Sequence, residues 1–159
     1  MTIMKRLVSI ISLLAVVLTV SALEPKKVKF SCDLTTINKT ENCHPRGPWT
    51  LTDVDGGWCI VRQDKYPDIP LGNKGLLIYK DCHTGRIWCY DIQCPMCDAQ
   101  GVEHEIYMET NLVARCKRCY GAWQNIHQGT GNQTNYMGEY WLVSYKVVQK
   151  GNMLYISNW

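Results

Sequence analysis

"CPMCDAQGVEHEIYMETNLVARCKRC", residues 94–119, contains two Cys-x-x-Cys pairs with 18 residues between them. Each pair forms a tight turn that presents two sulfurs on one side, and two such turns facing each other place four thiolates at the corners of a tetrahedron. The spacing predicts a metal centre whose ligands are Cys94, Cys97, Cys116 and Cys119. This donor set suits Zn²⁺ or a single iron and, with a small adjustment, a [2Fe–2S] cluster.

The alternative for these four cysteines is a pair of disulfides, which an oxidising compartment would favour in an exported protein. A disulfide closed within one Cys-x-x-Cys turn is typical of redox catalysts, and the strand-then-helix context of a thioredoxin-like site is missing here. Disulfides that bridge the two turns remain open. The metal centre is the preferred interpretation.

Composition limits the protein class. The chain has 159 residues, enough for one domain with a real core, and its 46% hydrophobic content argues against disorder. Its formal net charge is +3, with no Lys/Arg run long enough for a nucleic-acid groove. The sequence also lacks a nucleophile elbow and a phosphate-binding loop. We therefore expect an electron carrier or a binding protein rather than an enzyme.

The first 22 residues predict a secretory signal peptide. Lys5 and Arg6 precede a nearly uninterrupted apolar run over 7–20, and small residues stand at the positions that allow cleavage after Ala22. An uncleaved anchor is the second interpretation, although the run is shorter than the roughly 20 residues that span a bilayer. Lipidation at Cys32 is the third. All three place the domain outside the cytoplasmic membrane, in a periplasm or cell envelope, or in the secretory pathway.

Residues 23–48 show no sustained period and predict a linker, so the folded domain is expected over 49–159. Within it, runs rich in Val, Ile, Leu, Trp and Tyr alternate with turn residues, and each run has the length of a strand. The expected strands lie within 57–63, 75–82, 86–92, 102–110, 141–149 and 153–159. The fold class is therefore all-β.

This pattern predicts two hairpin turns and the position of one histidine on a strand face. We expect tight turns at Thr84-Gly85 and at Gly151-Asn152, because glycine supplies the positive φ that such turns need. In the expected strand 102–110, His104 falls on the apolar face. The preferred interpretation is that the His104 ring forms a hydrogen bond with a backbone carbonyl. The alternative is that His104 is a ligand.

The domain resembles the Rieske family in two ligand loops and a closing hairpin. The segment 71–97 is similar to the Rieske stretch that runs from a hairpin strand into the first ligand loop, with Tyr90, Asp91, Cys94 and Pro95 at the matching positions. The segment 116–131 resembles the second loop, and 140–158 resembles the closing hairpin. The nearest group is the Rieske-like envelope proteins of the Bacteroidetes type. The resemblance implies a small antiparallel β-sandwich or barrel, with a two-loop metal-binding subdomain like that of rubredoxin or a zinc ribbon.

The chain departs from the Rieske pattern at the ligands themselves. Cys97 and Cys119 stand where a Rieske centre has its two histidines, and the four histidines of the chain do not sit at ligand spacing. Four thiolates would lower the reduction potential of a [2Fe–2S] cluster and remove the imidazole that takes up a proton from quinol. A zinc site in the same place would be closed, redox-inert and structural.

Three hypotheses follow. The first is an exported Rieske-like domain that binds structural zinc or a [2Fe–2S] cluster and has an accessory or binding role in the cell envelope. The second is a low-potential [2Fe–2S] electron carrier that serves an oxidoreductase, and the third is a metal-free, disulfide-bonded secreted domain. The partner would be an unknown envelope protein or redox partner, and contact with a membrane would come only through an uncleaved signal or a lipid at Cys32.

The other five cysteines give weaker predictions. In a two-residue hairpin Cys82 would face Ile87, too far from Cys89 for a good disulfide, so both are expected to be small buried hydrophobes. Cys32 and Cys43 can close a loop in the expected linker. The strand residue Cys59 is expected in the core.

Overall fold

A computed structural model describes residues 25–34, 42–44, 57–81, 84–109, 113–124, 126, 129, 131–133 and 140–159. The expected signal peptide lies outside these residues. Within the described part of the chain, no helix is long and apolar enough to cross a membrane.

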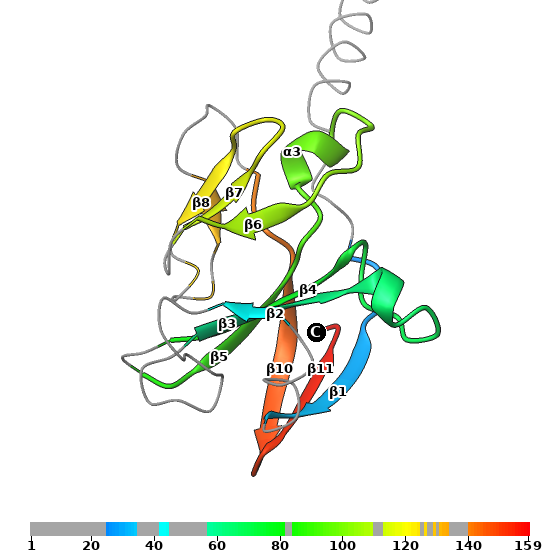
Figure 1. The fold of residues 1–159 in the computed structure, drawn as a ribbon, viewed down its shortest axis with the longest axis vertical. Helices are drawn as coiled ribbons and strands as arrows, with labels where there is room; N and C mark the ends of the chain where they lie inside the picture. The colour runs from blue at the N-terminus through cyan, green and yellow to red at the C-terminus, as the bar shows by residue number, and fades with distance from the viewer. Residues whose placement is uncertain are drawn as a thin grey trace, which may run out of the picture.

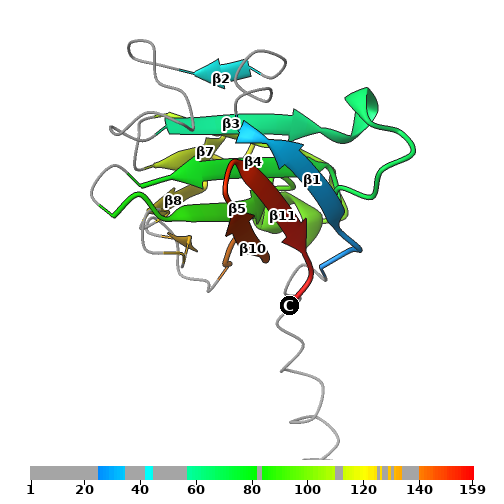
Figure 2. The same ribbon diagram turned by 90° about the horizontal axis from the view of Figure 1, so that it is seen from below.

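The described residues form an all-β protein with two antiparallel sheets, as the sequence predicts. The larger sheet has seven strands in the order β1-β11-β10-β5-β4-β3-β2 and curls into a half-barrel (Figures 1 and 2). Its strands are β1 (Lys29–Asp33), β2 (Asn42–His44), β3 (Gly57–Arg62), β4 (Gly75–Lys80), β5 (Ile87–Asp91), β10 (Ser144–Lys150) and β11 (Met153–Ser157). The smaller sheet contains β6 (Ile106–Met108), β7 (Ala114–Cys116), β8 (Ala122–Gln124) and β9 (Asn132–Gln133). The described residues also include two single turns of helix, η1 (Gln63–Lys65) and α3 (Pro95–Asp98).

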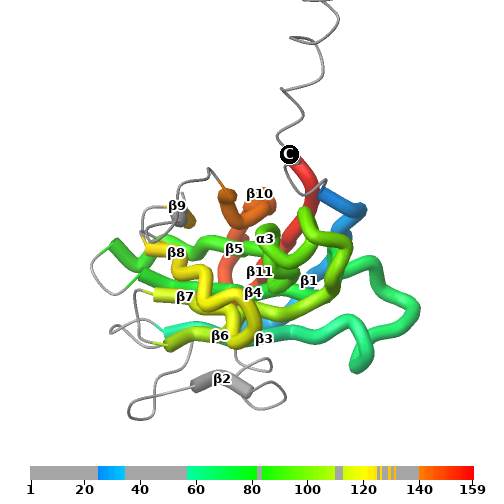
Figure 3. The backbone as a smooth tube through the Cα atoms, turned by 90° about the horizontal axis from the view of Figure 1, so that it is seen from above, coloured from blue at the N-terminus to red at the C-terminus, as the bar shows by residue number. Residues whose placement is uncertain are grey.

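The central strands of the larger sheet are buried on both faces. Successive side chains of a strand point to opposite faces, so Leu76 and Ile78 of β4 enter one hydrophobic cluster while Leu77 and Tyr79 enter another. The first cluster lies inside the curl of the larger sheet. The second contains residues of both sheets and the cysteines of the metal motif, so the smaller sheet packs against the larger one beside the ligand loops (Figure 3). This double burial explains the continuous apolar run of β4.

The expectation of a linker over 23–48 is wrong for the described part of that stretch. Residues 29–33 form β1, which pairs with β11 at one edge of the larger sheet, while β2 pairs with β3 at the other edge (Figure 2). Val28 and Phe30 are buried in the core. Alternation with lysines gives this stretch a polar composition. Its apolar side chains are buried by pairing with the distant C-terminal strand, by the bridge of Val28 to Leu71 and by packing of Phe30 on Tyr66.

One of the two expected hairpin turns is confirmed and the other is wider than expected. Lys150 pairs with Met153 across a two-residue turn, with Gly151 at φ 58°. In the other hairpin the last pair is Lys80 with Ile87, so six residues connect the strands. The Asp81 carboxylate accepts hydrogen bonds from the Thr84 backbone N–H and hydroxyl, which stabilise this wider loop. Cys82 lies outside the described residues.

Four further cysteines lie on strands of the larger sheet. Cys89 is a buried thiol, as expected, and burial raises its pKa well above the usual value. Cys59 is fully buried in β3, as expected, but it is disulfide-bonded, and the strand register places Cys43 directly opposite it. Cys32 of β1 is a thiol, so the suggested pairing of Cys32 with Cys43 is wrong.

Candidate metal centre

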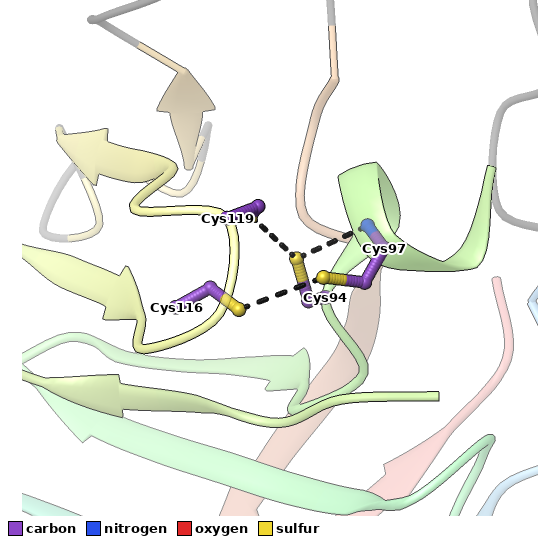
Figure 4. Close-up of side chains that lie close together, drawn as sticks. All are labelled: Cys94, Cys97, Cys116 and Cys119. Carbon is purple, nitrogen blue, oxygen red and sulfur yellow. Dashed lines mark hydrogen bonds between the residues drawn. The ribbon is translucent and has the colours of Figure 1, made fainter. Parts of the chain in front are cut away.

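The two Cys-x-x-Cys loops come from different sheets. Cys94 and Cys97 lie where β5 of the larger sheet continues into α3, while Cys116 ends β7 and Cys119 lies on the loop that joins β7 to β8 (Figures 1 and 4). The four side chains point toward one another between the loops (Figure 4). The predicted ligand residues are thus brought together.

The first loop is shaped by a proline-started turn of helix. Pro95 occupies the first helical position, where its missing N–H costs nothing and its fixed φ suits the helix. Cys94 caps this turn, and its Sγ accepts a hydrogen bond of 3.4 Å from the Cys97 backbone N–H. The turn therefore places both sulfurs on one side and gives the first a donor that stabilises a thiolate.

The second loop closes by backbone hydrogen bonds around Cys116. The Cys116 carbonyl accepts from the Tyr120 N–H at 3.0 Å, and the Cys116 N–H donates to the Gly121 carbonyl at 3.0 Å. Tyr120 has φ 58°, a left-handed conformation that costs a non-glycine residue free energy. A Cβ on Gly121 would lie 2.8 Å from Met96 Sδ and 3.3 Å from Cys119 Sγ. Only glycine lets the two loops approach this closely.

The spacing of the four sulfurs fits one tetrahedral ion. All four lie within 4.8 Å of one another. Two close separations join the loops, with 3.5 Å between the sulfurs of Cys94 and Cys119 and 3.7 Å between those of Cys97 and Cys116. Sulfurs bound at about 2.3 Å to one tetrahedral Zn²⁺ lie about 3.8 Å apart. The four cysteines can therefore bind a metal ion without rearranging the loops.

These separations are also far longer than the about 2.05 Å of a disulfide. All four cysteines are thiols, so the alternative of two disulfides in this cluster is not what the structure contains. Three of the four are fully buried, and Cys119 is the partly exposed one. The cluster is therefore shielded from solvent on every side except that of Cys119.

Burial controls the protonation of the cluster. Loss of solvation raises the pKa of Cys94 above its usual range and that of Cys97 to about 12. Burial also opposes ionisation of Cys116, but hydrogen bonds from the backbone N–H groups of Cys119 and Arg118 lower its pKa to about 7. Without a cation the buried group retains protons, and a bound divalent ion would replace them.

His104 lies at the edge of the cluster. Its Nδ1 is 3.3 Å from the Glu105 carbonyl oxygen, so the expected carbonyl contact is present, and 3.6 Å from Cys116 Sγ. The strand expected over 102–110 is shorter in the structure, where β6 covers only Ile106–Met108. His104 therefore lies just before the strand. His83, His127 and the side chain of His44 lie outside the described residues.

Three features of the centre were not predicted from the sequence. The contact between His104 and Cys116, the left-handed Tyr120 and the close approach at Gly121 all depend on packing between distant segments. The only local signal is "CKRCYG", residues 116–121, in which a tyrosine stands directly after the second cysteine of the pair.

No protein-family model matches the sequence, and no curated protein or solved structure matches it either. The fold and the cysteine cluster therefore carry the functional argument. They establish an all-β protein with four cysteines placed to bind a metal.

Proposed function

We propose that the protein binds one Zn²⁺ ion through Cys94, Cys97, Cys116 and Cys119, and that this ion is structural. The observation that carries the proposal is the spacing of the four sulfurs, all within 4.8 Å of one another. Zinc in structural sites is tetrahedral and takes four cysteines readily. No position is left for a substrate when all four ligands come from the protein, so the centre would hold the structure together rather than catalyse a reaction.

The same spacing favours a single ion over a [2Fe–2S] cluster. In such a cluster two cysteines bind each iron, and the bridging sulfides keep the two pairs of cysteines apart. Here no sulfur lies more than 4.8 Å from any other, whichever two cysteines are paired on one iron. A two-iron cluster would require the sulfurs to move apart.

The ion would join the two sheets. One pair of ligands follows β5 of the larger sheet and the other follows β7 of the smaller sheet. Because the binding free energy of a structural ion is also folding free energy, zinc would fix the smaller sheet on the larger one.

Export and the Rieske-like identity are part of the proposal. The all-β architecture, the two ligand loops and the hairpin of β10 and β11 support the resemblance. The apolar segment 7–20 and the disulfide of Cys59 support an oxidising compartment outside the cytoplasm, such as a cell envelope. The domain would have an accessory or binding role there, with an envelope protein as its partner.

Cleavage after Ala22 suits the fold better than lipidation at Cys32. A lipid on Cys32 requires a new N-terminus at that residue. Cleavage there would remove Val28 and Phe30 from the core and break the pairing of β1 with β11.

A redox-active iron centre is the second candidate, because one side of the cluster is open. Cys119 is partly exposed while the other three cysteines are buried, which gives electrons a short path to a redox partner. A single iron on four thiolates, or a [2Fe–2S] cluster, would then make the protein an electron carrier.

Metal analysis and a visible spectrum of protein lacking residues 1–22, purified without oxygen, test these candidates. Colourless protein with about one zinc per chain supports the proposal. Coloured protein with about one or two irons per chain contradicts it and supports the electron carrier.

A further inference from the structure

His104 contacts both ligand loops. Its carbonyl oxygen accepts a 2.7 Å hydrogen bond from the Cys94 backbone N–H at the start of the first loop. Its ring Nδ1 lies 3.6 Å from Cys116 Sγ in the second loop. The neighbouring backbone is fixed as well, because Glu105 bridges to Gln93 and the Ile106 N–H donates to the Ile92 carbonyl. The half-buried ring is therefore held in place beside the sulfur.

The contacts of Nδ1 determine which nitrogen carries a proton. Nδ1 is also 3.3 Å from the Glu105 carbonyl oxygen, and a carbonyl oxygen can only accept a hydrogen bond. This contact is a hydrogen bond only when Nδ1 bears the hydrogen, and we assign the hydrogen to Nδ1 on this ground. The same N–H faces the Cys116 sulfur, which makes that sulfur the acceptor.

A hydrogen bond to a cysteine sulfur stabilises the thiolate, which is the form that binds metal. Four thiolates around one Zn²⁺ leave a net negative charge in a site whose sulfurs are mostly buried. Donors that surround the sulfurs reduce the cost of that charge. Cys94 receives such a donor from the Cys97 backbone. His104 offers Cys116 a donor from a side chain, which substitution can remove.

We infer that His104 is a positioning residue of the metal centre, which donates its Nδ1–H to the Cys116 thiolate and strengthens metal binding. This inference rests on the proposed function. It extends the metal site to a fifth residue that does not bind the ion and that comes from the segment between the two loops.

His104→Leu and His104→Asn test this role as a matched pair. The two new side chains have the same shape, but only Asn carries an N–H near the place of Nδ1. Zinc affinity is measured by competition with a chelator. His104→Leu is expected to bind zinc about 10- to 100-fold more weakly than the wild type, the usual cost of losing such a partner. His104→Asn is expected to recover most of that loss.

A cobalt spectrum separates this role from a merely structural one. Co²⁺ replaces Zn²⁺ in the same proteins, and the sulfur-to-cobalt charge-transfer band is recorded. Removal of a hydrogen bond raises the energy of the thiolate electrons, so the band should move to longer wavelength in His104→Leu and remain near its original position in His104→Asn. Equal zinc affinity and equal spectra for wild type and His104→Leu would overturn the inference.

Two controls complete the test. If wild-type protein binds neither zinc nor cobalt, the proposed function fails; if it binds both and the His104 variants behave like it, only the inference about His104 fails. If His104→Leu does not fold, His104→Asn is compared with His104→Gln, whose N–H lies one bond farther out. Tighter binding by His104→Asn supports the inference, and equal binding overturns it.

Discussion

The sulfur of Cys94 lies 3.5 Å from the sulfur of Cys119, although the two cysteines are 25 positions apart in the chain. Cys97 and Cys116 form a second close pair, at 3.7 Å. Each Cys-x-x-Cys loop therefore has a sulfur in close contact with each sulfur of the other loop's pair. An ion bound here would act as a crosslink between the end of β5 and the β7–β8 loop.

The first prediction concerns loss of a ligand. Cys94→Ser should abolish retention of zinc and lower the free energy of unfolding by several kcal/mol, since structural zinc contributes about 10–16 kcal/mol in small zinc domains. Cys32→Ser is the matched control, because Cys32 is a thiol on β1 that packs against the other hydrophobic cluster. Zinc content and urea unfolding provide the measurements. Full zinc retention by Cys94→Ser would contradict its role as a ligand.

The second prediction concerns pH. Burial raises the pKa values of Cys94 and Cys97, so both thiols are protonated in the metal-free protein between pH 6 and 8 and must release their protons to zinc. Zinc affinity should therefore rise with pH, by about tenfold per pH unit for each proton released. Cys116, with a pKa of about 7, adds to the slope only below that pH. Competition with a chelator of known pH dependence measures the slope, and affinity independent of pH would exclude thiol ligands.

The third prediction concerns backbone strain at Tyr120. This residue is 65% exposed and has φ 58°. Glycine adopts that conformation without strain, so Tyr120→Gly should increase the stability of the zinc-loaded protein by about 0.5–1 kcal/mol after the entropy cost of glycine. Tyr120→Ala is the control, because it removes the ring but keeps the strained Cβ. If both variants unfold at the same urea concentration, strain at this position is not relieved by glycine.

The fourth prediction concerns the close approach at Gly121. A methyl group there would lie 2.8 Å from Met96 Sδ and 2.9 Å from the Trp123 ring. Gly121→Ala should push the loops apart, destabilise the protein by about 1–3 kcal/mol and weaken zinc binding. The double variant Gly121→Ala, Met96→Ala should recover part of both losses, because it removes one of the two clashes. Wild-type stability and zinc affinity in Gly121→Ala would show that the loops tolerate a wider spacing.

The sequence predicted the parts of the site that depend on local chemistry. The two Cys-x-x-Cys turns are local, so the spacing of the cysteines alone predicts the four ligands. The Gly151-Asn152 turn was found for the same reason. Tyr120 was not identified as strained, because its left-handed backbone follows from closure of the loop around Cys116.

Features that depend on distant pairing were missed. The sequence predicts a linker where β1 lies, because its strand partner, β11, is more than 100 residues away and Phe30 is buried by distant residues. The turn expected at Thr84-Gly85 is present but wider, and hydrogen bonds from Thr84 to the Asp81 carboxylate stabilise the wider loop.

X-ray absorption at the zinc edge of protein loaded with one equivalent of zinc tests the central claim most directly. The account predicts four sulfur neighbours at about 2.3 Å and no nitrogen or oxygen in the first coordination shell. Fewer than four sulfurs, or a second metal near the first, would contradict a single structural ion held by Cys94, Cys97, Cys116 and Cys119.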